Sequence, residues 1–196
     1  FGIENTLNFQ LPVDTLTPWF TPLFIIYISW VWLWPVVIPF IIYLANGNKG
    51  FYEYNVNSLF MYIIGTIIYI LVPTTTTPRD FIDGTIQILS PNSMFYQIIN
   101  ELSVSENNIW GSFPSYHNFW ASLFIFFALG KSVKWFYRYP MLLLGSLISL
   151  STLVLHQHCL MDVIMTYTMT GIFFHLINKY NLAIQFEKFL NRILKI

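Results

Sequence analysis

Residues 21–45 read TPLFIIYISWVWLWPVVIPFIIYLA, and no charged side chain interrupts them. A helix needs about 20 consecutive, mainly apolar residues to cross the hydrocarbon core of a bilayer, so this stretch can hold one span. Pro22, Pro35 and Pro39 would end or kink a helix in water. Membrane helices tolerate proline where neighbouring helices satisfy the freed carbonyl groups. The stretch therefore predicts a membrane-spanning helix.

The composition of the whole chain agrees with this prediction. Of its 196 residues, 56% are hydrophobic, 19% are aromatic and only 9% are charged, whereas about 25% of residues in soluble domains are charged. The formal net charge is zero, which gives no electrostatic reason to expect a nucleic-acid partner. Cys159 is the one cysteine, so an internal disulfide is excluded. Lipid is the expected solvent of this chain.

Uncharged windows set the number of expected spans. They cover residues 15–48, 54–78, 107–130, 139–161 and 163–178, and they predict spans at about 20–44, 57–73, 115–131, 138–155 and 158–178. The last span is long enough only if its helix begins near His158. This start places Asp162 in the first turn, where a carboxylate suits the positive end of the helix dipole. We expect an all-α transmembrane bundle that forms a single domain over residues 1–196. The first residue, Phe1, leaves a preceding leader segment open.

The basic residues predict the orientation. Eight of the nine Lys and Arg residues fall in alternate connections or in the tail, and the positive-inside rule assigns that side to the cytoplasm. The N-terminus and Arg79 then lie outside, in a multi-pass plasma (inner) membrane protein. Residues 80–104 are apolar but broken by Gly84 and Pro91, which predicts an interfacial or re-entrant segment. The tail, 179–196, is amphipathic and suits a helix on an anionic cytoplasmic leaflet.

The unusual polar residues are expected at the outer face, on three separate segments of the chain. They are Arg79 after the second span, Ser115 and His117 at the start of the third, and His156, His158 and Asp162 between the fourth and fifth. Ionisable groups at membrane depth are costly and tend to mark function. We therefore expect the functional site at this face.

The spacing of these residues indicates acid–base and nucleophilic chemistry. His158 and Asp162 are four residues apart, so on a helix they share one face. The carboxylate can then accept the proton of one imidazole nitrogen and leave the other nitrogen free to attack. His156 fits this pairing poorly. His117 could protonate a leaving oxygen, and Arg79 could bind a phosphate group through two hydrogen bonds.

The start of the third span also predicts an anion site. Pro114 is suited to a first helical turn. The backbone amides of Ser115, Tyr116 and His117 follow it, at the positive end of the expected helix. Such an end binds anions such as phosphate. Ser115 could instead act only as the N-terminal cap of the helix.

These residues form two motifs that resemble those of a known family. Pro114–His117 reads Pro-Ser-Tyr-His, and Ser151–Asp162 reads Ser-Thr, five residues, His, three residues, Asp. This pattern resembles the second and third motifs of the type 2 phosphatidic acid phosphatase superfamily. That superfamily includes lipid phosphatases and the related sphingomyelin and inositol phosphorylceramide synthases. The resemblance covers roughly residues 72–178.

The chain departs from the family pattern in each of its three motifs. The first motif of the family is Lys, six residues, Arg-Pro. With Arg79 as its arginine, the lysine position holds Val72, and proline precedes the arginine. Thr152 replaces the arginine of the third motif, and Tyr116 replaces the glycine of the second. Fewer cations favour a singly charged phosphodiester over a phosphomonoester dianion. A degenerate site, or a protonated His156 in place of a lost cation, is the alternative.

The resemblance implies a mechanism without metal or other cofactor. His158 attacks phosphorus, Asp162 orients it, and His117 protonates the departing oxygen. A phosphohistidine intermediate then passes its group to water or to an alcohol, with His117 as the base. The substrate would be a membrane lipid, reached laterally. The residues expected to bind its phosphate are Arg79, Ser115, Tyr116 and His156.

Other functions stay open at this point. His117, His158 and Asp162, with or without His156, could bind a metal ion and make the chain a metalloenzyme or a metal transporter. A non-catalytic transport or interaction subunit with a relic site is a second alternative, and Arg79 could be a simple interfacial anchor. The sequence does not separate phosphatidate, phosphatidylglycerol phosphate, a polyprenyl diphosphate or a head-group transfer substrate. It also leaves the oligomeric state open.

Overall fold

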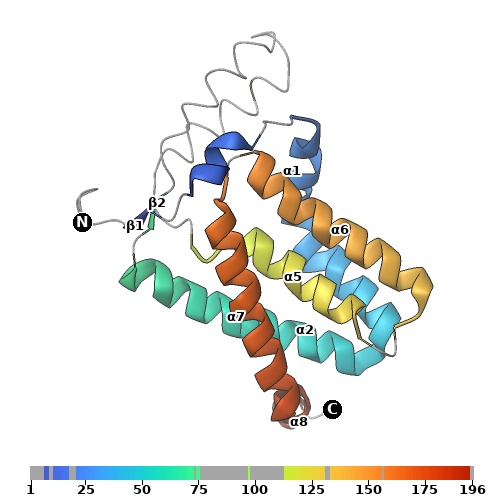
Figure 1. Cartoon of the computed structure of the whole chain (residues 1–196). Coiled ribbons are helices and arrows are strands. Elements are labelled where there is room, and N and C mark those ends of the chain that lie inside the picture. Colours follow the sequence, from blue (N-terminus) through green and yellow to red (C-terminus); the bar gives the residue numbers. More distant parts are fainter. Residues whose placement is uncertain are drawn as a thin grey trace.

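The computed structural model describes residues 7–8, 11–17, 21–72, 74–75, 97, 113–130, 133–155 and 157–194. Within these ranges the protein is helical (Figure 1), apart from a parallel pairing of two short strands, β1 (Leu7–Asn8) and β2 (Thr74–Thr75). The helices are α1 (Phe24–Trp32), α2 (Ile38–Leu71), α5 (Tyr116–Ala128), α6 (Trp135–Val154), α7 (Leu160–Lys179) and α8 (Leu182–Leu194). Two 3₁₀ turns, Pro12–Leu16 and Thr21–Leu23, precede α1. The expected all-α class is confirmed.

A sharp reversal joins the first two predicted spans. A π-helical turn, Leu33–Val37, connects α1 to α2, and proline within it withholds one backbone donor from the helix. Helix α2 then reverses at Gly47, where φ is 68° and ψ is −163°. This backbone region is open to glycine because glycine has no Cβ. The helix resumes at once, so no loop separates spans 20–44 and 57–73.

Helix α5 lies at the centre of the bundle. Nine of its 13 residues are buried, and it packs against α2, α6 and α7. Phe119, Leu123 and Phe124 are fully buried in the main apolar core. At 1.5 Å per residue, α5 is about 20 Å long, because it begins at Tyr116 and ends at Ala128. It is therefore shorter than the predicted span 115–131.

A glycine allows close packing of α5 and α6. A Cβ atom at Gly145 of α6 would lie 2.9 Å from the backbone oxygen of Ala121 in α5. Small residues at such crossings let two helix backbones approach closely, as is common in membrane proteins.

Two helical stretches of the described chain, Leu33–Leu71 and Leu160–Lys179, are long and apolar enough to cross a membrane. Large apolar side chains also remain exposed on the outside of the bundle, for example Ile70, Leu71 and Leu143. An extended apolar surface of this kind suits contact with lipid. The bundle of five spans stays a prediction.

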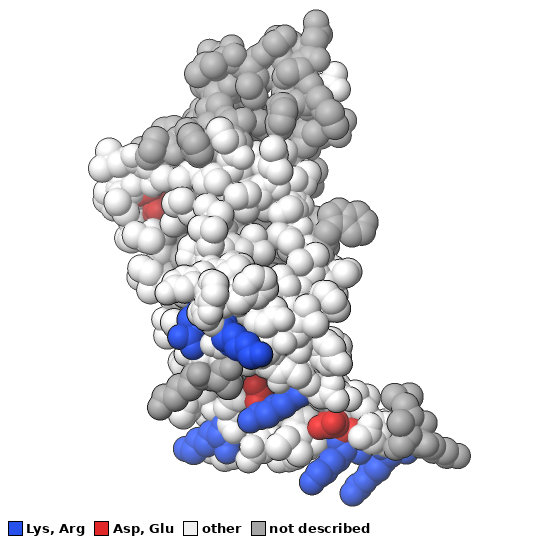
Figure 2. All heavy atoms as spheres, turned by 90° about the vertical axis from the view of Figure 1, so that its right-hand side faces the viewer, with Lys and Arg blue, Asp and Glu red and all other residues white. Residues whose placement is uncertain are grey.

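Basic side chains gather toward one end of the molecule. Six of the nine Lys and Arg residues lie within the described ranges, near the reversal of α2, at the start of α6, at the end of α7 and on α8. Figure 2 shows them in the lower half of one face. This grouping agrees with their placement in alternate connections.

Helix α8 forms most of the predicted amphipathic tail, 179–196. Asn181, with φ of 51°, turns the chain between α7 and α8 in the left-handed conformation that asparagine tolerates. In Figure 1, α8 is seen nearly end-on below α7, so the two helices run in different directions. Ala183 is buried, whereas Phe189 and Ile193 are exposed. Binding of this helix to a membrane surface stays a prediction.

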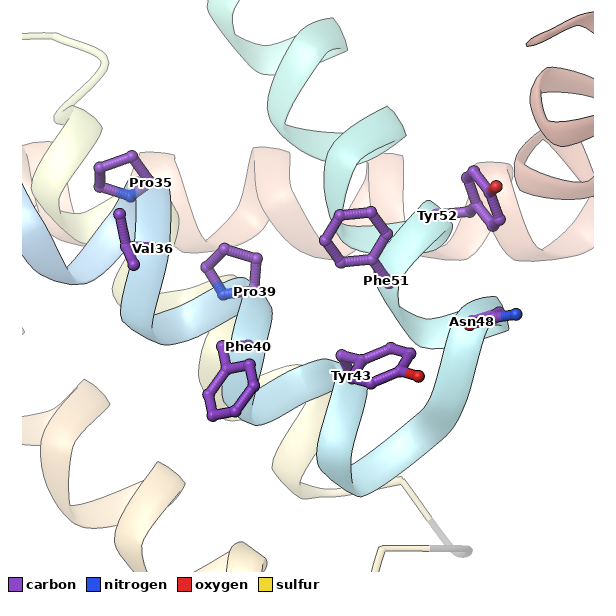
Figure 3. A pocket seen from close by; sticks show the side chains of 8 residues that line it. All are labelled: Pro35, Val36, Pro39, Phe40, Tyr43, Asn48, Phe51 and Tyr52. Carbon is purple, nitrogen blue, oxygen red and sulfur yellow. The ribbon is translucent and has the colours of Figure 1, made fainter. Parts of the chain in front are cut away.

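An apolar groove of about 560 Å³ lies at the reversal of α2, between its two arms (Figure 3). Its lining residues are Pro35, Val36, Pro39, Phe40, Tyr43, Asn48, Phe51 and Tyr52. None of them belongs to the residues predicted to do chemistry.

Candidate active site

The three residues predicted to do chemistry lie together at the N-terminal ends of α5 and α7. His117 is the second residue of α5, and Asp162 is in the first turn of α7. The rings of His117 and His158 have centroids 6.0 Å apart and an interplanar angle of 57°. His158 Nδ1 lies 3.5 Å from Asp162 Oδ2. The structure therefore brings the two histidine motifs to one site.

Asp162 is held by its own helix and faces His158. Its side chain is fully buried, and Oδ2 accepts a hydrogen bond of 3.3 Å from the backbone N–H of Cys159. His158 lies two residues before the first residue of α7 rather than within it, but the predicted pairing is kept. A carboxylate on the Nδ1 side favours the tautomer with a proton on Nδ1. Nε2 is then the nitrogen with a free lone pair.

The end of α6 positions the loop that carries His158. The backbone N–H groups of Gln157 and His158 both donate to the carbonyl of Thr152, at 2.9 and 3.2 Å. Helix ends leave carbonyl groups without partners in the helix, and the loop satisfies this one by folding back over α6. The side chain of His158 is 10% exposed. His156 lies outside the described residues, as does Arg79, so their predicted phosphate contacts stay predictions.

Ser115 is the N-terminal cap of α5. Its Oγ accepts a hydrogen bond of 3.2 Å from the backbone N–H of Asn118, the usual role of serine at this position. Its own N–H, predicted to face an anion, donates to Thr166 Oγ1 of α7 at 3.1 Å. Ser115 is fully buried. Its contact with phosphate stays a prediction.

A neutral hydrogen-bond network occupies the position where the resembled third motif has arginine. Asn118 Nδ2 donates to Ser115 Oγ and to Thr152 Oγ1, at 2.9 Å each. All three side chains are fully buried. The network joins the second motif to the third without a charge. Asn118 was not predicted from the sequence, although it is a polar residue within an apolar helix.

Tyr116, which replaces the motif glycine, packs on the second arm of α2. Its ring stacks on Tyr62 with centroids 5.7 Å apart, and its hydroxyl donates to the Tyr62 carbonyl at 3.2 Å. A Cβ atom at Gly65 would lie 2.9 Å from the Tyr116 hydroxyl. The bulky residue in the motif is therefore accommodated by a glycine on the facing helix. A phosphate contact of Tyr116 stays a prediction.

Asp14, in the turn Pro12–Leu16, caps α7 beside the site. Its Oδ1 accepts a hydrogen bond of 2.8 Å from the N–H of Leu160, the first residue of α7. Its Oδ2 accepts another of 2.7 Å from Leu11. The side chain is buried, and its charge suits a helix N-terminus. In the sequence, Asp14 stands out only as a single carboxylate at the edge of the long uncharged window 15–48.

Tyr27 of α1 is a third site residue that was not predicted from the sequence, after Asn118 and Asp14. Its ring stacks on His117 with centroids 4.5 Å apart and an interplanar angle of 19°. Its hydroxyl donates to Gln157 Oε1 at 3.3 Å. The chain has twelve tyrosines, so nothing in the sequence distinguished this one.

The described residues contain no group of three or more His, Cys, Asp or Glu side chains that could hold a metal ion. The alternative set that includes His156 stays untested, because that residue lies outside the described ranges.

Comparison with known proteins gives one match. A protein-family model described as the PAP2 superfamily matches residues 2–176. The matched range includes both histidine motifs as well as Asp14 and Tyr27. No curated protein and no solved structure is similar enough to the chain to count as a match.

Proposed function

The chain belongs to the PAP2 superfamily, the type 2 phosphatidic acid phosphatase superfamily that its motifs resemble, and on this premise we propose that it is a membrane enzyme that transfers a phosphoryl-linked group of a lipid. Members of the superfamily are generally phosphatases. The observation that supports the proposal most directly is the geometry of His158, which faces Asp162 at 3.5 Å and lies next to His117. In the proposal, His158 is the nucleophile, Asp162 is its orienting carboxylate and His117 is the general acid.

The proposed reaction has two steps. In the first, the lone pair of His158 Nε2 forms a bond to phosphorus, and the bond from phosphorus to the leaving oxygen breaks. His117 gives its proton to that oxygen. In the second step, His117 takes a proton from water or an alcohol, whose oxygen attacks phosphorus. The phosphorus–nitrogen bond then breaks and its electron pair returns to His158. Asp162 stabilises the positive charge on His158 while the intermediate exists.

The neutral network at Thr152 favours a phosphodiester substrate. A phosphomonoester dianion gains more from nearby cations than a singly charged diester does. In this chain the arginine of the third motif is replaced by Thr152, which is fully buried and hydrogen-bonded to Asn118. Head-group transfer between a phospholipid and an alcohol, as in the synthase-like branch, is therefore our second candidate beside hydrolysis.

The membrane arrangement of the site is also part of the proposal. The site lies at the N-terminal ends of α5 and α7, whereas the described basic residues lie near the reversal of α2, at the start of α6, at the end of α7 and on α8. With the basic end in the cytoplasm, the histidines face the outer leaflet. A lipid head group would reach them laterally, from between α5, α6 and α7.

The test is release of phosphate or head group from a panel of lipids by the purified protein. The panel contains phosphatidate, phosphatidylglycerol phosphate, a polyprenyl diphosphate and phosphodiester lipids with alcohol acceptors, each with and without chelator. His158→Ala and His117→Ala are compared with His175→Ala, a matched control on an exposed position of α7. Brief reaction with labelled lipid, followed by alkaline denaturation, traps a phosphorus–nitrogen bond.

The outcomes separate the alternatives. Turnover that survives chelator and is lost in the His158 and His117 variants, but not in His175→Ala, supports the proposal. Activity that persists in His158→Ala refutes the nucleophile. Loss of activity with chelator favours the metal alternative, and an inactive protein across the panel favours a non-catalytic role.

A further inference from the structure

One aromatic side chain contacts both histidine segments. Tyr27 is 5% exposed and lies on α1, outside all the motifs described above. The face of its ring covers the imidazole of His117, with centroids 4.5 Å apart and planes only 19° from parallel. Its hydroxyl donates to the side chain of Gln157, the residue before His158.

We propose that Tyr27 is a positioning residue for the reaction. Its ring fixes the plane of the general acid, His117, and its hydroxyl fixes the loop that carries the nucleophile, His158. This inference rests on the proposed function, because a fixed separation of the two imidazoles matters only if they act on the same phosphorus. Errors of about 1 Å in such a separation can lower a rate by about 100-fold.

Two other contacts of the site act on the His158 loop alone. Thr152 holds the backbone of the loop at Gln157 and His158, and Asp162 faces Nδ1 of His158. Both contacts connect His158 to its own neighbours, α6 and α7. Tyr27 connects the loop to His117 at the start of α5. A ring stacked on the face of the imidazole limits its tilting, in addition to the orientation that hydrogen bonds to its nitrogens fix.

Helix α1 holds Tyr27 in place. Phe24, one turn earlier on the same helix, is also 5% exposed, so the two residues form one buried face at helical spacing. Helix α1 packs against α6, the helix that leads into the His158 loop. Helix α6, which ends at the site, therefore also supports the helix that carries Tyr27.

The experiment compares three variants of the full chain in the lipid assay described above. Tyr27→Phe keeps the ring and removes the hydroxyl, and Tyr27→Leu removes the ring. Phe24→Leu is the matched control, with the same helix and the same exposure. We expect kcat to fall about fivefold in Tyr27→Phe, the value of one neutral hydrogen bond, and about 100-fold in Tyr27→Leu. KM should stay within about twofold in both Tyr27 variants, because positioning acts on the transition state rather than on substrate binding. Phe24→Leu, which keeps an apolar side chain at its position, should keep kcat.

A second measurement does not depend on turnover. The chain has only four histidines, so its labelled imidazole signals in a magnetic resonance spectrum are few, and His117→Gln identifies that of His117. The ring of Tyr27 shifts this signal because it lies flat on the imidazole. We expect the shift to remain in Tyr27→Phe and to disappear in Tyr27→Leu.

Each outcome supports or overturns the inference. An unchanged His117 signal in Tyr27→Leu overturns it, because the stack is then absent. So does wild-type kcat in Tyr27→Leu when His158→Ala is inactive, or an equal loss of kcat in Phe24→Leu; in both cases the proposed function stands. A wild-type protein that is inactive on every lipid refutes the proposed function, and the positioning role falls with it even if the stack is seen.

Discussion

The pairing of Asp162 with His158 supports a quantitative prediction for Asp162→Asn. The substitution keeps the size of the side chain and removes its charge. In the proposed first step, His158 becomes positively charged when Nε2 bonds to phosphorus. At the observed 3.5 Å and an effective dielectric constant of about 20, two unit charges attract each other by about 5 kcal/mol. Since each 1.36 kcal/mol is a factor of about ten in rate, we expect kcat to fall between about 10³- and 10⁴-fold.

The fold should change little in the same variant. Asp162 Oδ2 accepts the N–H of Cys159 at the start of α7, and an asparagine oxygen can accept that hydrogen bond as well. The loss of stability should therefore stay near the few tenths of a kcal/mol to about 1 kcal/mol that a charge near a helix end contributes. A thermal or denaturant transition measured beside the lipid assay separates the two effects.

Asp14→Asn is the matched control for this prediction. Asp14 is also buried and also caps α7, through Leu160. Its change should affect stability by a similar amount and leave kcat within about threefold of the wild type, because binding and chemistry are then both intact. The reasoning is refuted if Asp162→Asn keeps more than about a tenth of the wild-type kcat, well above what the charge calculation allows. An equal loss in Asp14→Asn would assign the effect to the helix end instead.

Three further predictions concern the packing around the site. Gly65→Ala should destabilise the protein by about 1–3 kcal/mol through its clash with Tyr116, and addition of Tyr116→Leu should restore much of that loss in a thermal-melt double-mutant cycle; additive effects would contradict the contact. Asn118→Leu should lower the free energy of unfolding by about 1–3 kcal/mol, because the buried Thr152 hydroxyl loses its donor and Ser115 Oγ keeps only the backbone N–H of residue 118, and an unchanged melting temperature would argue against the network. Gly145→Ala should destabilise by about 1–3 kcal/mol because its Cβ meets backbone 2.9 Å away. Gly171→Ala, whose nearest neighbour is at 3.5 Å, should instead stabilise α7 by about 0.5–1 kcal/mol; equal responses of the two glycines would show that the α5–α6 approach is looser than described.

Several features of the site followed from local spacing. His158 and Asp162 are four residues apart, and this spacing predicted the pairing seen at 3.5 Å. The prediction survived although α7 begins only at Leu160, because an extended cap residue still places the preceding side chain near the first turn. Ser115 opened the third predicted helix, and the structure shows it as the cap. Its amide, expected to face an anion, is bonded to Thr166 instead, which no local pattern could reveal.

The sequence by itself determined the helical class of the protein, its superfamily and the residues of the two histidine motifs. These properties depend on the length of apolar windows and on spacings of a few residues, which a one-dimensional pattern contains. Only the tertiary structure decided that Gly47 reverses α2, that Asp14 caps α7 across 146 residues, and that Tyr27 covers His117. Such contacts depend on how each helix is rotated and how closely it approaches the next. That is set by side-chain packing throughout the bundle, including the close approach at Gly145, and an apolar stretch with many similar aromatic residues does not specify which of them will meet the site.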